Sequence, residues 1–284
     1  MRFTKMHGVG NDYVYVNLFE ETVKDAPALA WAVSRPHFGV GADGLILIGP
    51  GEKAAFRMTV YNADGSRAKM CGNGARCVGK YLYDRGFTRE TEIPLETDSG
   101  VKTLHIEPEA GKAKRVTVDM GAPQQTFEEV PCLLGSGPVR LVHLEADRKA
   151  FFALPIGMGN PHAVIFLPEP ADDRMLRSCG PALEKHPGFP AGVNVEFARV
   201  LTKDALSMRV WERGSGITLG CGTGASAAFA AAVLLGYTGR EARISLDGGE
   251  LSCRWDKKTD HVFMTGPAAF VFDGEWLEET DDEH

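Results

Sequence analysis

Short runs of alternating hydrophobic and polar residues recur along the chain, which is the period-2 pattern of half-buried β-strands. In the clearest of them, residues 56–60 alternate and deliver Asn62 to the end of a predicted strand. Similar short apolar or alternating runs predict strands at 14–16, 45–48, 101–106, 115–120, 163–167, 194–200, 206–211, 251–255, 262–264 and 270–272, and at Ile244.

Other stretches have the signals of helices. Asp25 just ahead of Pro27 predicts a helix start near residue 27, because proline is pre-shaped for a first helical turn. Helices are also predicted over 74–83, within 172–185 and over 223–235. The Pro-, Gly- and polar-rich region from Gln124 to Pro138 is typical of a linker.

One short motif occurs twice, as Cys-Gly-Asn-Gly-Ala at 71–75 and Cys-Gly-Thr-Gly-Ala at 221–225, at an offset of 150 (221 minus 71). Each copy opens a predicted helix. Further pairs recur in the same order at similar offsets: Gly10-Asn11 with Gly159-Asn160, Tyr61-Asn62 with Trp211-Glu212, Pro27-Ala28-Leu29 with Pro181-Ala182-Leu183, and Met120 to Pro123 with Met264 to Pro267.

These matches predict an internal duplication with a period far longer than that of a solenoid. We expect an α+β fold of two similar halves, residues 1–123 and 124–267, whose matched motifs meet at an interdomain cleft. The apolar strand at 270–272 lies beyond the repeat, so the segment from about 268 to 284 is expected to cross back to the first half. Its acidic end, from Glu278, is expected to be mobile.

Composition narrows the range of partners. The chain has 284 residues, 44% hydrophobic and 24% charged, with a net charge of −7. No basic cluster offsets the repulsion from phosphate, so nucleic acid and anionic membrane are disfavoured and a small molecule is expected. The N-terminus has no apolar signal region, and the longest apolar run, 225–235, is shorter than the roughly 20 residues of a membrane span. We therefore expect a cytoplasmic location.

Six cysteines are too few for a disulfide scaffold in a chain of this length. No Cys-x-x-Cys pair occurs, and the spacing of Cys71 and Cys77 matches no common zinc pattern, so no metal site is expected. Cys71 and Cys221 occupy the same position in the two copies of the repeated motif. The other four cysteines have no such counterpart, which favours a structural role for them.

A cysteine at a helix N-terminus is expected to have a lowered pKa and a reactive thiolate. If the sulfurs of Cys71 and Cys221 lay about 7 Å apart, two thiolates would repel by about 2.4 kcal/mol at a dielectric of about 20, so the pair would hold one proton. One thiolate and one thiol suit proton removal from one face of a carbon and delivery to the other.

A substrate carboxylate would fit the helix starts. The backbone N–H groups of Gly72, Asn73, Gly222 and Thr223 point away from the helices and can bind an anion. They would also hold the charge that develops when an α-proton leaves. No pyridoxal-binding motif is apparent, so no cofactor is expected. A redox pair or thiol sensor is the non-enzyme alternative and requires the two sulfurs to reach disulfide distance.

The chain resembles the diaminopimelate epimerases, which interconvert LL- and meso-diaminopimelate without a cofactor in lysine and peptidoglycan precursor synthesis. The resemblance spans nearly the whole chain. Its motifs are His7 to Asp12, Asn62 to Ser66, Cys71 to Cys77, Gly159 to His162, Asn194 to Phe197, Glu212 to Gly214 and Cys221 to Ala225. It implies two pseudo-symmetric domains, each a mixed, mostly antiparallel sheet wrapped around a central helix, and allows a homodimer.

The resemblance also implies residue roles. Cys71 and Cys221 would be the acid/base thiols, with His162 and Glu212 near them. Diaminopimelate has a second amino-acid group far from the reacting carbon, and an arginine fork suits its carboxylate. Both ends of the substrate would be bound by side chains drawn from the same motifs: Asn11, Asn62, Asn160, Asn194, Glu212 and Arg213.

Three positions depart from the family pattern. Ile217 stands where glutamate is common, and Gly220 where alanine is common; Gly44 stands where some members have a side-chain amide. Related enzymes remain alternatives, namely a proline, hydroxyproline or histidine racemase. A cysteine-free isomerase of the phenazine type is disfavoured because both thiols are present.

Overall fold

A computed structural model describes residues 1–277. The chain divides into two compact units. Unit 1 consists of residues 1–8, residues 12–116 and the C-terminal segment from Ala268. Unit 2 consists of residues 9–11 and 117–267. Both combine helices with largely antiparallel strands, so the expected α+β class is confirmed.

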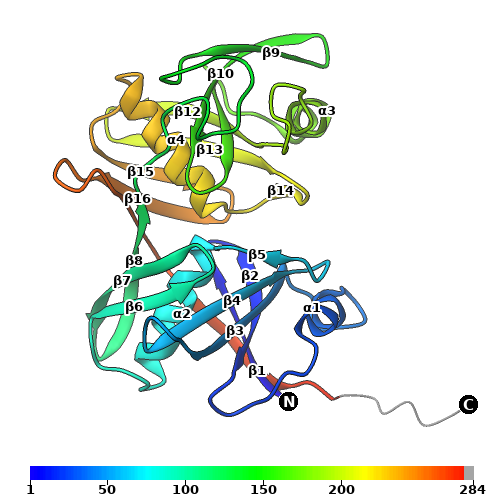
Figure 1. The fold of residues 1–284 in the computed structure, drawn as a ribbon, viewed down its shortest axis with the longest axis vertical. Coiled ribbons are helices and arrows are strands. Elements are labelled where there is room, and N and C mark those ends of the chain that lie inside the picture. The colour runs from blue at the N-terminus through cyan, green and yellow to red at the C-terminus, as the bar shows by residue number, and fades with distance from the viewer. Residues whose placement is uncertain (278–284) are drawn as a thin grey trace, which may run out of the picture. The chain divides into compact units, whose positions relative to one another are not determined.

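Unit 1 is built from two helices and strands from both ends of the chain (Figure 1). Its elements are β1 (Arg2–Gly8), β2 (Asn11–Asn17), α1 (Ala26–Ser34), β3 (Gly44–Pro50), β4 (Phe56–Asn62), β5 (Arg67–Ala68), α2 (Gly72–Asp84), β6 (Glu92–Thr97), β7 (Gly100–Glu109), the start of β8 (Lys112–Gly121) and β18 (Ala269–Glu275).

Unit 2 contains the end of β8 and the remaining elements. These are β9 (Val142–Ala146), β10 (Lys149–Gly157), β11 (Pro161–Phe166), α3 (Asp173–Glu184), β12 (Asn194–Thr202), β13 (Ala205–Glu212), β14 (Gly216–Thr218), α4 (Gly222–Leu234), β15 (Glu241–Leu246), β16 (Gly249–Trp255) and β17 (Val262–Gly266).

The strands of the two units pair in the same order. In unit 1, β2 is parallel to β3, β3 antiparallel to β4, and β4 both antiparallel to β5 and parallel to β6. In unit 2, the same relations join β11, β12, β13, β14 and β15. The hairpins β6–β7 and β15–β16 complete the match.

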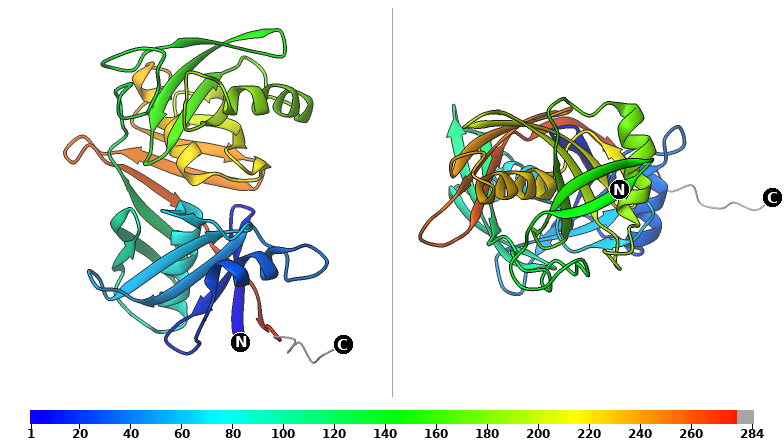
Figure 2. Two further views of the ribbon diagram at one scale, coloured as in Figure 1. Left: turned by 45° about the vertical axis from the view of Figure 1, so that its right-hand side comes forward. Right: turned by 90° about the horizontal axis from the view of Figure 1, so that it is seen from above.

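The helices α2 and α4 lie among the strands of their own units (Figure 1), and their side chains are mostly buried. Eight alanines and glycines between Gly222 and Ala232 let the strands of unit 2 pack closely on α4. The strand β18 pairs antiparallel with β1, so the two ends of the described chain lie side by side in unit 1 (Figure 2). Residues 270–272, which lie beyond the repeated motifs, form part of β18 in unit 1.

One prediction was wrong. The region from Gln124 to Pro138 is no linker, because Phe127, Val130 and Cys132 are buried in the core of unit 2. Isolated bridges also join Gln124 to Gly157 and Thr126 to Pro138. Prolines and glycines are compatible with such a folded irregular segment, which composition cannot distinguish from a linker.

Strands β1, β5, β6, β9, β10 and β14 were not predicted. β9 has the alternating burial of a strand with one wet face, and that pattern was readable in the sequence. The helices begin earlier than predicted, with α2 at Gly72 and α4 at Gly222. The segment from Glu278, expected to be mobile, lies outside the described residues.

Candidate active site

Two cysteines cap the two buried helices in the same way. Cys71 precedes α2 with φ −137° and ψ 111°, and Cys221 precedes α4 with φ −114° and ψ 112°. The N–H of Gly74 donates to the Cys71 sulfur at 3.3 Å, and the N–H of Gly224 donates to the Cys221 sulfur at 3.3 Å. A sulfur thus replaces the usual oxygen of an N-cap. Such hydrogen bonds favour a thiolate over a thiol.

The surroundings of Cys221 oppose this effect. Burial raises the pKa of the Cys221 thiol well above its ordinary value, and the charges of Glu212 and Glu196 raise it further. The hydrogen bonds from Thr223 and Gly224 lower it by less. The expectation that helix position lowers the pKa is therefore wrong for Cys221, because desolvation and two nearby carboxylates outweigh the helix terminus.

Glu212 lies at the end of β13 and is linked to Cys221. Burial raises the pKa of Glu212, while hydrogen bonds from Thr218 and from the Cys221 thiol lower it. The hydroxyl of Thr218 donates to Glu212 Oε1. Glu212 therefore lies beside the Cys221 thiol in unit 2. Thr218 was not predicted, although it lies three residues before Cys221.

A chain of polar side chains runs from β12 to the start of α4. The carboxylate of Glu196 is 2.7 Å from Nδ1 of His162, and Nε2 of that ring is 2.8 Å from Oδ1 of Asn160. The Nδ2 of Asn160 is 3.5 Å from the Thr223 hydroxyl, which is itself 3.5 Å from the sulfur of Cys221.

This chain shows how His162 is connected to the thiol. His162 is fully buried and reaches Cys221 through Asn160 and Thr223. Glu196 was not predicted as a site residue. It lies within a motif that carried the family resemblance, and a glutamate flanked by the apolar residues Val195 and Phe197 was the available signal.

The side-chain amide of Asn194, at the start of β12, forms hydrogen bonds with the backbone of two other segments. Its Nδ2 donates to the carbonyl of Pro161 at 3.0 Å, and its Oδ1 accepts the N–H of Arg213 at 3.0 Å. The guanidinium of Arg213 donates to the carbonyl of Ala191 at 2.7 Å. The predicted residues Asn194 and Arg213 are therefore brought together in unit 2.

Glu184, the last residue of α3, holds the turn that follows Glu212. Its carboxylate accepts hydrogen bonds from the indole N–H of Trp211 at 2.7 Å and from the N–H of Gly214 at 3.0 Å. The turn carrying Glu212 and Arg213 is thus tied to a helix. Sequence reasoning missed Glu184, which has no motif of its own.

In unit 1, Asn62 ends β4 as predicted, and its amide donates to the Ser66 hydroxyl at 2.9 Å. Asn73 lies in the first turn of α2, where its Oδ1 accepts from the buried guanidinium of Arg76 at 2.8 Å. Each helix also presents N–H groups in its first turn that lack intrahelical acceptors. These groups belong to Gly72 and Asn73 in α2, and to Gly222 and Thr223 in α4.

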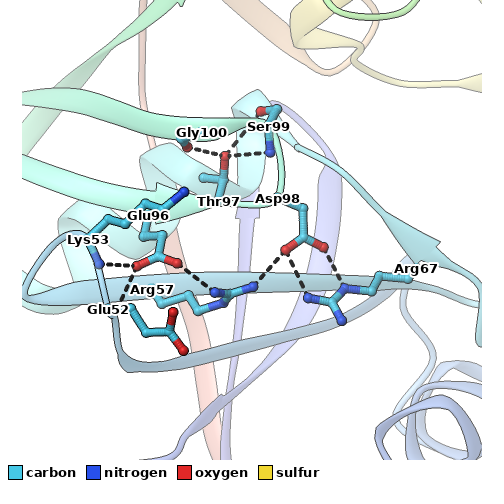
Figure 3. A network of polar contacts seen from close by, with 9 residues as sticks. All are labelled: Glu52, Lys53, Arg57, Arg67, Glu96, Thr97, Asp98, Ser99 and Gly100. Carbon is cyan, nitrogen blue, oxygen red and sulfur yellow. Dashed lines mark hydrogen bonds and ion pairs between the residues drawn. The ribbon is translucent and has the colours of Figure 1, made fainter.

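An ionic network in unit 1 supports the strand that precedes Cys71 (Figure 3). Asp98 accepts from Arg57 at 2.8 Å and from Arg67 of β5 at 2.8 Å. Hydrogen bonding to Arg67 lowers the pKa of Asp98. Glu96 accepts hydrogen bonds from Arg57 at 2.6 Å and from the backbone N–H groups of Glu52 and Lys53, in the loop between β3 and β4.

The three departures from the family pattern have local explanations. A Cβ on Gly44 would lie 2.1 Å from the carbonyl oxygen of Tyr61, so no side chain fits at the start of β3. A Cβ on Gly220 would lie 2.5 Å from the carbonyl oxygen of Val9, within unit 2. Ile217 pairs with Trp211 across β13 and β14 and packs against the core of unit 2.

The predicted residues divide between the units. Unit 1 contains Cys71, Asn62, Gly72 and Asn73. Unit 2 contains Cys221, Asn160, His162, Asn194, Glu212, Arg213, Gly222 and Thr223, and also Asn11 through the segment 9–11.

Residues 1–277 contain no helix of the length and apolarity needed to cross a bilayer. No group of three or more His, Cys, Asp or Glu side chains in the same range is placed to hold a metal ion.

Solved structures with this fold include amino-acid racemases and epimerases. A probable proline racemase from Agrobacterium radiobacter K84 superposes with a TM-score of 0.75 at 16% identity, covering 99% of this chain and 94% of that one. A hydroxyproline epimerase from Agrobacterium vitis gives a TM-score of 0.69 at 17% identity, covering 96% and 91%. The fold is therefore that of the proline racemase and epimerase class.

Sequence similarity is more specific. A family model described as diaminopimelate epimerase matches residues 3–126 and 155–271. The diaminopimelate epimerase of Acetivibrio thermocellus is 50% identical over 275 residues, covering 97% of this chain and 98% of the relative. That of Methanococcus maripaludis is 46% identical over 275 residues, covering 97% and 99%. The chain belongs to the diaminopimelate epimerase family, as the sequence motifs predicted.

Proposed function

We propose that this chain is an isomerase that interconverts LL- and meso-diaminopimelate, in lysine and peptidoglycan precursor synthesis. Family membership supports the substrate and the reaction. The observation that carries the mechanism is the matched pair of cysteine N-caps, each accepting an N–H at 3.3 Å. Two such thiols suit a two-base inversion without a cofactor.

In this proposal the chain arose by an internal duplication, with one half near residues 1–123 plus about 268–284 and the other near 124–267. The shared order of strand pairing supports the duplication. Each unit contributes one thiol to an interdomain cleft, and the two sulfurs face opposite sides of the substrate α-carbon.

The two thiols have different neighbours at equivalent positions. At the sequence offset of 150, Glu212 of unit 2 corresponds to Asn62 of unit 1, and Glu196 corresponds to Ile46. Carboxylates beside Cys221 disfavour its thiolate. We therefore assign Cys221 as the thiol acid of the pair before turnover. Cys71 is then the thiolate base, and turnover in the opposite direction exchanges these roles.

The substrate carboxylate next to the reacting carbon is bound by N–H groups of Gly72, Asn73, Gly222 and Thr223, which also stabilise the charge formed on proton removal. Asn11, Asn62, Asn160, Asn194, Glu212 and Arg213 bind the amino-acid groups. Because the guanidinium of Arg213 already donates to Ala191, substrate binding would share or replace that hydrogen bond.

The test is hydrogen exchange in D2O with purified protein and LL-diaminopimelate, L-proline or L-histidine as separate substrates. We expect deuterium at an α-carbon of diaminopimelate alone. Cys71→Ala and Cys221→Ala should each abolish inversion, while Cys132→Ala, in the core of unit 2, should keep turnover per folded molecule. Normal inversion by either active-site variant would refute the two-base scheme.

A homodimer and a cytoplasmic location stay predictions for this chain. Sedimentation equilibrium of the purified protein tests the first, with a mass near twice 30.7 kDa expected for a dimer. Fractionation of cells that express the chain tests the second.

A further inference from the structure

We propose that Glu196 is a positioning residue for the reaction, because through His162 it fixes the carboxamide of Asn160 beside Cys221. The inference rests on the proposed function, in which Asn160 binds substrate. Glu196 would not touch the substrate itself. Its effect would pass through two side chains of unit 2.

Glu196 is an unusual core residue. Its side chain is 0% exposed, Oε1 is 2.7 Å from Nδ1 of His162, and Oε2 has no hydrogen-bond partner among the described residues. Burying a carboxyl group with one unpartnered oxygen is costly for folding. A residue retained at such a cost needs a role that packing alone does not supply.

The hydrogen bonds define where protons lie. The Oδ1 of Asn160 can only accept, so Nε2 of His162, at 2.8 Å, carries a hydrogen in this arrangement. Nδ1 and Oε1 of Glu196 then share one further proton, either as imidazolium and carboxylate or as imidazole and carboxylic acid. In both states the ring donates to Asn160.

A donating ring determines which way the carboxamide faces. With Oδ1 held by His162, the Nδ2 of Asn160 turns toward the Thr223 hydroxyl, at 3.5 Å. A neutral histidine that lacks the proton shared with Glu196 can instead place its hydrogen on Nδ1 and leave Nε2 as an acceptor, which favours the flipped carboxamide. Glu196 therefore selects the orientation that Asn160 presents near Cys221.

Unit 1 offers an internal comparison. Ile46 corresponds to Glu196 at an offset of 150, and Tyr13 corresponds to His162 at an offset of 149. A Cβ on Gly224 would lie 2.8 Å from Glu196 Oε1, and a Cβ on Gly74 would lie 2.4 Å from Ile46 Cδ1. The two side chains thus occupy the same place beneath the first turn of their helices, and in unit 1 that place is apolar.

The experiment compares Glu196→Gln with Glu196→Leu in the epimerisation assay, with Ile46→Leu as the matched control in unit 1. Glutamine can donate an amide N–H to Nδ1 and keep the hydrogen on Nε2, so kcat/KM should stay within about 3-fold of wild type. Leucine leaves Nδ1 without a partner, and kcat/KM should fall about 10- to 100-fold. The control should retain wild-type kinetics.

A second readout is independent of turnover. Nitrogen-15 NMR of labelled histidine, with His162 assigned by substitution, should show a protonated Nε2 in the wild type and in Glu196→Gln. Wild-type kcat/KM in Glu196→Leu, an equal loss in Glu196→Gln, or an unprotonated Nε2 in the wild type would each overturn the proposal. Lack of exchange by the wild type on diaminopimelate would instead reject the proposed function, and the NMR result would still test Glu196.

Discussion

Gly224, in the first turn of α4, offers a test of how tightly the surroundings of Cys221 are packed. Replacement by alanine adds a Cβ that would lie 2.8 Å from Glu196 Oε1 and 3.2 Å from the Cys221 sulfur. Ordinary contact begins at 3.4 Å, so the carboxylate must retreat by about 0.6 Å. Glu196 is fully buried and bonded to His162, which leaves it little room to move.

Two effects of opposite sign determine the stability of this variant. Alanine in a helix is favoured over glycine by up to about 1 kcal/mol. Overpacking a well-filled core costs about 1–3 kcal/mol. We expect a net loss near 1 kcal/mol, which lowers Tm by about 2–4 °C for a unit of this size.

Activity should respond more strongly than stability. A displaced Glu196 disturbs His162 and Asn160, and the added methyl crowds the sulfur directly. We expect kcat/KM to fall about 10-fold, equivalent to about 1.4 kcal/mol of transition-state stabilisation. The measurement is epimerisation of diaminopimelate together with thermal unfolding of the same preparation.

The matched control is Gly239→Ala, because a Cβ at this exposed glycine meets nothing within 4 Å. That variant should stay within about 0.5 kcal/mol of wild type and keep full activity. If Gly224→Ala also shows wild-type Tm and wild-type kcat/KM, the close packing of Glu196 against α4 has no functional consequence, and our reasoning is refuted.

Two further predictions concern unit 1. Burial raises the pKa of the Cys77 thiol from 9.0 to about 11, so the thiol ionises at lower pH in the unfolded chain than in the folded one. Its contribution to folding stability is therefore fully present below pH 9 and is lost as the pH rises toward 11. When Tm is followed across this range, it should decline less in Cys77→Ala than in the wild type. An equal decline of Tm with pH in the variant and the wild type would contradict this prediction. Asp98→Asn weakens the arginine network of Figure 3 and should lower the free energy of unfolding by about 0.5–1.5 kcal/mol, as measured by denaturant unfolding. The control is Glu109→Gln, which should have a smaller effect because the ion pair of Glu109 with Lys114 is exposed. Equal effects of the two substitutions would show that the network adds nothing to stability.

Local sequence signals predicted much of the fold. The alternation over 56–60 predicted β4 and the position of Asn62, and the repeated cysteine motif predicted two helix starts within about two residues. Such signals succeed because strand alternation and helix capping depend on neighbours within a few residues. The linker prediction for 124–138 failed because the burial of this segment depends on core residues far along the chain, among them Phe189 and Phe197.

The site divides in the same way. The chain by itself determined the two cysteines, their helix positions, the duplicated motifs and the family, since each is carried by residue type and spacing. Tertiary structure raised the pKa of the Cys221 thiol, because the sulfur becomes buried and comes close to Glu196 and Glu212 only when β12, β13 and α4 pack together. Desolvation and charge act through space, so residue order does not reveal them. The hydrogen-bonded path from Glu196 to Cys221 likewise exists only once β11, β12 and α4 are packed together.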